Sequence, residues 1–149
     1  MATIRAVRAG TAAFGAAITA IQSGIPLARV ELVDEKQIAI CNAYSKLALP
    51  EKPTLFLEFH GSEAAVREQS ERFGEIVAEF EGSAFEWSTK AEDRTRLWKA
   101  RHDMFWADKA YRPNSDVVVT DVCVPISRLA ECVVETQKDI QNSRLIAPL

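Results

Sequence analysis

The predicted strands of this chain alternate apolar and charged side chains, and this alternation limits the kind of sheet they can form. In the strand expected at residues 54–59, one face carries Leu55, Leu57 and Phe59. The other face carries Phe56 and Glu58, and residues 28–32 repeat the pattern with Glu31. Central strands of parallel sheets read instead as continuous apolar runs. We therefore predict an α+β fold in which a ferredoxin-like antiparallel sheet has its helices packed on one face.

Turn residues divide the chain into alternating strands and helices. Gly24 and Pro26 end the first helix, and Pro113 stops a later one. The expected strands cover residues 3–7, 27–32, 54–59, 85–88 and 117–124. The expected helices cover residues 11–23, 35–46, 62–81, 91–111 and 127–141. No glycine-rich phosphate loop follows any of these strands, which weighs against a nucleotide-binding Rossmann unit.

Length and composition fit one globular domain and argue against several partners. The chain has 149 residues, of which 48% are hydrophobic and 26% charged, as in an ordinary globular protein. A net charge of -3 gives no electrostatic footprint for nucleic acid. No apolar run approaches the roughly 20 residues that span a bilayer. The N-terminus also lacks the apolar core of a signal peptide, so we expect a cytoplasmic protein with no nucleic-acid partner.

The cysteines and histidines do not suggest a metal site. Cys41, Cys123 and Cys132 are odd in number and widely spaced, without a C-x-x-C pair. This pattern predicts reduced thiols and not a zinc ribbon or a redox dithiol. His60 and His102 fall on different predicted elements, so a site of histidines alone cannot be built.

Arg101 lies in the middle of an otherwise apolar helix face. At about 100° per residue, the stripe around it consists of Leu97, Trp98, Met104 and Phe105. One interpretation is an arginine whose stem covers apolar surface, or which pairs with Asp108 two turns on. The other is a guanidinium in a partly desolvated pocket that binds a carboxylate at two points. The residues alone leave both interpretations open.

Two long runs of sequence carry a family resemblance. Residues 97–129 contain the pattern L-W-x-A-R-H, a variable turn, and then T-D-V-C-V-P-I-S-R-L. A second run, PTLFLEFHGSE, and the C-N-x-Y-S-K pattern match as well. Together they resemble the C-terminal region of FAD-linked D-lactate dehydrogenases, a branch of the vanillyl-alcohol-oxidase-like flavoproteins. The resemblance extends over essentially the whole chain.

The resemblance implies a fragment of a larger enzyme. Residues 1–149 would be part of its C-terminal substrate domain, without the upstream FAD-binding domain and without the metal motif expected downstream of Leu149. The parent protein would oxidise a D-2-hydroxy acid, with D-lactate the expected substrate, to the 2-oxo acid, with FAD as hydride acceptor. A cytochrome, a quinone or an electron-transfer flavoprotein would then take the electrons. The resemblance also implies a divalent metal, a location in the cytoplasm or at the inner membrane, and an inactive isolated fragment.

The resemblance favours a functional role for Arg101, because this position matches the arginine that binds the substrate carboxylate in the family. Related 2-hydroxy-acid enzymes place a lysine where this chain has Val119 and Thr120, which favours a small monocarboxylate. Trp87, Trp98 and Trp106 are expected as core or interface rings. Other polar candidates, each of which could equally be a solvated side chain, are Glu31, Asn42, Glu58, His60 and Asp121.

A second interpretation belongs to a different class of function. The chain would be a stand-alone ferredoxin-like binding or dimerisation module without catalytic activity. The open sheet face with Glu31, Phe56 and Glu58 would then pair with a second copy and give a homo-oligomer. A reading frame that continues into a flavin domain and a metal motif would decide for the enzyme.

Overall fold

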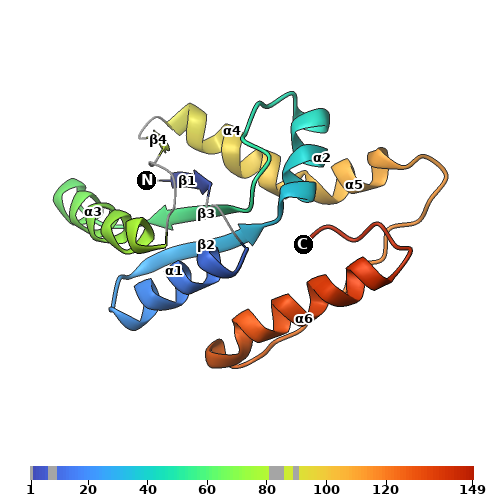
Figure 1. The fold of residues 1–149 in the computed structure, drawn as a ribbon. Coiled ribbons are helices and arrows are strands. Elements are labelled where there is room, and N and C mark those ends of the chain that lie inside the picture. Colours follow the sequence, from blue (N-terminus) through green and yellow to red (C-terminus); the bar gives the residue numbers. More distant parts are fainter. Residues whose placement is uncertain (1, 7–9, 81–85, 89–90) are drawn as a thin grey trace.

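The computed structural model describes residues 2–6, 10–80, 86–88 and 91–149 (Figure 1). Its strands are β1 (Ala2–Ala6), β2 (Leu27–Val33), β3 (Thr54–Phe59) and β4 (Glu86–Ser88). The first four helices are α1 (Gly10–Gln22), α2 (Glu35–Ser45), α3 (Glu63–Glu79) and α4 (Ala91–His102). The chain ends with α5 (Met104–Tyr111), the 3₁₀ turn η1 (Ile126–Arg128) and α6 (Leu129–Asn142). No helix in this described part of the chain is both long and apolar enough to cross a membrane.

The four strands form one antiparallel sheet in the order β2-β3-β1-β4. This arrangement confirms the predicted α+β class. A helix, α2, connects β2 to β3, and the ferredoxin-like detail of the prediction stays a prediction. The pairing of β2 with β3 sets Arg29 opposite Glu58 and Glu31 opposite Phe56, after an irregularity near Leu27. All four of these side chains therefore belong to the same face of the sheet.

One face of the sheet packs against α1 and α3 (Figure 1). Small residues on α1 allow the helix to approach the strands closely, and larger rings fill the space beside them. The core on this side consists of Ala13, Ala16, Ala20, Leu55, Leu57, Phe59, Phe73 and Val77. The alternation in β3 predicted this face correctly.

Helices also cover the other face, so the prediction of helices on one face only is wrong. Phe56 is 1% exposed and packs against Trp98 of α4, with 6.3 Å between the ring centroids. The second core cluster around this pair also contains Val33, Ile38, Cys41, Ala100 and Met104. Alternation shows which side chains share a face, but it does not show where a helix forty residues further along the chain will dock. Phe56 is therefore a core residue and cannot form an open pairing surface.

The predicted helix at residues 91–111 is two helices, because the chain breaks at Asp103 between α4 and α5. Cys41 lies in the core under α4, while Cys123 is exposed, and all three cysteines are free. Of the three tryptophans, Trp98 is buried as expected and Trp106 is exposed. Trp87 lies outside the residues whose side chains the structure describes.

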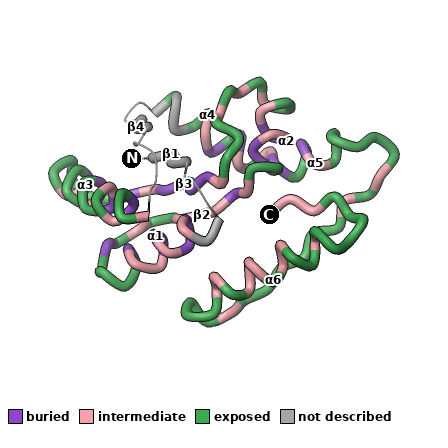
Figure 2. Tube along the Cα trace, in the orientation of Figure 1, coloured by how far each residue is buried: buried purple, intermediate pink, exposed green. Residues whose placement is uncertain are grey.

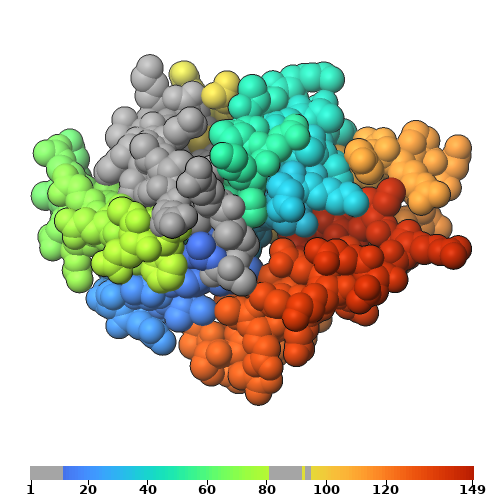
Figure 3. All heavy atoms as spheres, viewed as in Figure 1, coloured from blue at the N-terminus to red at the C-terminus, as the bar shows by residue number. Residues whose placement is uncertain are grey.

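The strand predicted at residues 117–124 is absent, and the chain there is irregular. None of the described strands pairs with it, and a single extended segment without a neighbour forms no ladder. Its apolar side chains are left in solvent, and Val118 is 83% exposed. No residue from position 108 onward is buried, and Figure 2 shows α6 in the colours of exposed and intermediate residues only. Helix α6 and the tail after it lie on the surface beside α1 and α2 (Figure 3).

Replacement of Phe56 by alanine tests the packing of the second face. Removal of a fully buried ring leaves a cavity between β3 and α4, and we expect the free energy of unfolding to fall by about 3–5 kcal/mol. Urea denaturation measures this change. Val118→Ala is the control, because Val118 is exposed and its loss should change stability by less than about 0.5 kcal/mol. Equal effects of the two substitutions would contradict the buried position of Phe56.

Candidate functional site

Arg101 reaches the sheet from the last turn of α4. Trp98, one turn earlier, fixes this helix on Phe56, and the same helix face carries Arg101 to β2. There its Nε contacts Oε2 of Glu31 in an ion pair. The alternative partner considered from the sequence, Asp108, instead accepts a hydrogen bond from Nε2 of Gln37 at 2.8 Å. The prediction that Arg101 pairs with Asp108 is therefore wrong, because its partner is Glu31 of β2.

The two atoms that touch in this ion pair are buried, but the two side chains are partly exposed. Nε of Arg101 and Oε2 of Glu31 are both buried, although their contact lacks the geometry of a hydrogen bond. The whole side chains of Arg101 and Glu31 are nevertheless 35% and 28% exposed. Because Nε itself is buried, the exposed part of Arg101 lies elsewhere on the side chain. Part of Arg101 therefore stays accessible while its Nε touches Glu31.

A second ion pair lies beside the first on the same sheet face. Nε of Arg29 is 3.8 Å from Oε2 of Glu58, and Nε2 of His60 is 3.0 Å from Oε1 of Glu58. The guanidinium carbon of Arg29 also stands 4.3 Å from the centroid of the Trp98 ring, in a cation–π contact. Partial burial alone would raise the pKa of Glu58, but the hydrogen bond from His60 and the charge of Arg29 lower it below its usual value. Glu58 is therefore ionised near neutral pH.

These contacts bring together five charged or titratable side chains around Trp98. We call them the charged cluster, which consists of Arg29, Glu31, Glu58, His60 and Arg101. Two arginines face two glutamates, so the formal charges of the four groups cancel. Nε1 of Trp98 is buried and has no hydrogen-bond partner among the described residues. The cluster combines cations that could bind a carboxylate with an apolar ring that excludes water from one side.

Among the described residues, no hydrogen bond or ion pair joins the other two sequence candidates, Asn42 and Asp121, to the charged cluster. The amide of Asn42 is bound to the backbone of Leu49, donating to its oxygen at 2.8 Å and accepting from its nitrogen at 3.0 Å. Asn42 thus fastens the loop after α2. Asp121 is exposed in the irregular segment before η1. Arg29, in contrast, was not singled out from the sequence, because only the docking of α4 brings Trp98 over it.

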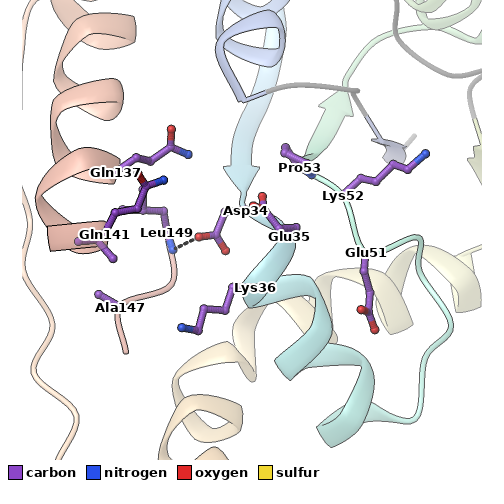
Figure 4. Close-up of a pocket in the computed structure, with 11 residues that line it drawn as sticks. Asp34, Glu35, Lys36, Glu51, Lys52, Pro53, Gln137, Gln141, Ala147 and Leu149 are labelled. Carbon is purple, nitrogen blue, oxygen red and sulfur yellow. Dashed lines mark hydrogen bonds between the residues drawn. The ribbon is translucent and has the colours of Figure 1, made fainter. Parts of the chain in front are cut away.

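A polar cavity of about 470 Å³ lies between the start of α2 and the C-terminal tail (Figure 4). Asp34 caps α2 through a 2.7 Å hydrogen bond from the nitrogen of Gln37. It also joins the tail, because its second oxygen accepts from the nitrogen of Leu149 at 3.0 Å. Burial raises the pKa of Asp34, and these hydrogen bonds only partly oppose that effect. Arg101 does not line this cavity.

The described part of the chain contains no group of three histidine, cysteine, aspartate or glutamate side chains that could hold a metal ion. The charged cluster supports another chemistry, which is the binding of an anion by a guanidinium.

The pH dependence of Asp34 can be tested with Asp34→Asn. Below the ordinary aspartate pKa of 3.8, both side chains are neutral, and the variant differs only by a constant from the altered contact with Leu149. As pH rises through the raised pKa of the folded state, ionisation favours unfolding, so the wild type should lose stability relative to the asparagine variant. Urea unfolding from about pH 3 to about pH 7 measures this difference.

The control for this experiment is Glu63→Gln, which removes an exposed carboxylate from the first turn of α3 and should change stability by less than about 0.5 kcal/mol. If the asparagine variant runs parallel to the wild type, the carboxyl of Asp34 is not buried as described.

Comparison with known proteins gives a consistent result. Residues 6–147 match the sequence model of the family described as FAD linked oxidases, C-terminal domain. A Danio rerio protein named probable D-lactate dehydrogenase, mitochondrial, is 45% identical over 129 residues, which cover 87% of this chain and 26% of that protein. D-lactate dehydrogenase (cytochrome), mitochondrial, from Arabidopsis thaliana is 41% identical over 130 residues, covering 87% and 23%.

A protein of the same name from Kluyveromyces lactis is 32% identical over 137 residues, covering 87% of this chain and 24% of its own length. The chain thus spans about a quarter of the length of these relatives.

Proposed function

We infer the function from the family of the chain, which belongs to the FAD linked oxidases and represents part of their C-terminal domain. We propose that its parent protein oxidises a D-2-hydroxy acid to the 2-oxo acid, with FAD as the hydride acceptor. The proposed substrate is D-lactate. The names of the relatives support D-lactate as the substrate. Two of those names also support a cytochrome as electron acceptor, in preference to a quinone or an electron-transfer flavoprotein.

We assign no FAD site to the described residues of this chain. The sequence has no glycine-rich phosphate loop after a strand, and Arg101 does not line the cavity at Asp34. We propose that FAD, and the divalent metal expected from the family resemblance, are bound mainly by other parts of the parent protein. The hydride chemistry belongs to the flavin, and this chain contributes substrate binding.

Arg101 is the residue to which we assign that binding. Its Nε is buried and contacts Glu31, while the side chain as a whole is 35% exposed. The terminal nitrogens can present two parallel N–H donors to the carboxylate of a 2-hydroxy acid, which gives both affinity and orientation. This half-buried guanidinium, held on a fixed helix beside the sheet, is the observation that carries the proposal.

The alternative of a stand-alone dimerisation module is not favoured. It relied on an open sheet face with Phe56, and that side chain is buried beneath Trp98. The match to an enzyme family over nearly the whole chain also speaks against it. A homo-oligomer would need a different surface.

Arg101→Ala in the flavin-loaded parent protein tests the proposal. Hydrogen bonds to charged groups contribute roughly 1.5–3 kcal/mol, so kcat/KM for D-lactate should fall by about tenfold to more than a hundredfold. Arg101→Lys should restore little, because an ammonium group cannot present the two-donor fork. Flavin content should stay normal, since the residue addresses the substrate.

Melting temperature, flavin occupancy and steady-state turnover should be measured on the same preparations. Arg96→Ala, which removes an exposed arginine from the same helix, is the matched control and should leave turnover close to wild type. A purely structural Arg101 would give the opposite pattern, with lost stability or flavin but near-normal turnover per bound flavin.

A further inference from the structure

We propose that Glu31 is a positioning residue that holds the guanidinium of Arg101 by its Nε edge and so directs the two terminal nitrogens at the substrate carboxylate. This inference rests on the proposed role of Arg101 in binding the substrate. It adds a residue from β2 whose side chain does not itself need to touch the substrate.

The contact atoms support this assignment. A guanidinium has five N–H donors, divided between Nε and the two terminal nitrogens. Glu31 contacts Nε, and both contact atoms are buried. Among the described residues, no other ion-pair partner is found for Arg101. The terminal pair is therefore left for a second carboxylate, which can approach without displacing the first.

The sheet makes Glu31 a rigid support. Its backbone pairs with that of Phe56 in β3, at a strand position between two buried layers. The next charged residue on that face of β2, Arg29, is already engaged by Glu58 and by the ring of Trp98. Glu31 and Arg101 thus form a pair separate from the neighbouring one. Trp98 packs on Phe56, the residue opposite Glu31, and this contact fixes helix α4. The backbones that carry Glu31 and Arg101 are therefore both held in place.

The energetics indicate what the loss of Glu31 would do. An arginine whose Nε is buried without a counter-charge is costly, and its side chain would turn toward water. The guanidinium would remain charged but would no longer be oriented. Substrate affinity should suffer more than the chemical step, because bound substrate still meets the same flavin.

Glu31→Gln in the flavin-loaded parent protein is the test, because it preserves shape and removes the charge. We expect KM for D-lactate to rise roughly tenfold, which corresponds to about 1.4 kcal/mol, while kcat changes by less than about twofold. The dissociation constant of oxalate, a non-reacting carboxylate, should rise by a similar factor and can be followed through the flavin absorbance. In an Arg101→Lys background, Glu31→Gln should change neither value further.

The control is Glu63→Gln, which removes an exposed carboxylate paired with Arg67 on α3 and should leave both constants unchanged. Unchanged constants in Glu31→Gln would overturn the positioning role. Lower constants would also overturn it, because they would show that Glu31 competes with the substrate. A lower flavin content or a lower melting temperature, with unaltered oxalate binding, would show that the Arg101–Glu31 pair has only a structural role.

A second variant protects the test against misfolding. Glu31→Asp keeps the charge on a shorter side chain and should give an intermediate KM with full flavin content; a wild-type KM would count against the proposal. Failure of the proposed function looks different, because Arg101→Ala would then leave oxalate binding intact. If Arg101→Ala abolishes oxalate binding while both Glu31 variants bind normally, only the role of Glu31 is refuted.

Discussion

The contact between Trp98 and Phe56 is the interaction on which the candidate site depends. Phe56 is a buried aromatic residue on the sheet face that also carries Arg29, Glu31 and Glu58, and Trp98 covers it at 6.3 Å between ring centroids. This burial docks α4 across β2 and β3. Once α4 is docked, Arg101 meets Glu31 and the ring of Trp98 lies over Arg29. Hydrophobic packing therefore creates the electrostatic arrangement.

The charged cluster illustrates how partial burial changes the use of a salt bridge. A fully exposed pair of this kind would contribute little to stability, since water competes for both groups. Here the two contacting atoms of Arg101 and Glu31 are buried, while their side chains as a whole are partly exposed. In the proposed role, the buried contact with Glu31 orients Arg101, and the accessible part of Arg101 recognises the substrate. Arg29 and Glu58 neutralise each other beside this pair, so neither competes for Arg101.

The C-terminal part of the chain shows the opposite situation. From position 108 onward, no residue is buried, and α6 rests on α1 without contributing a core residue. The valine-rich segment at residues 117–124 has strong strand-forming composition, yet it remains irregular, because strand propensity is realised only against a neighbour. Its valines stay exposed because no described strand pairs with this segment.

The sequence by itself determined the class of the fold and the division of β3 into two faces, because side-chain direction in a strand follows from position alone. Leu55, Leu57 and Phe59 lie together in the core as their spacing requires. The pattern around Arg101 drew attention to this residue but left open whether it binds a ligand or only covers apolar surface. Only the tertiary structure decided that Phe56 is buried, that Arg101 pairs with Glu31 and not with Asp108, and that Asn42 serves a loop. These outcomes depend on contacts between segments far apart in the chain, and periodicity within one segment carries no information about which distant surface it will meet.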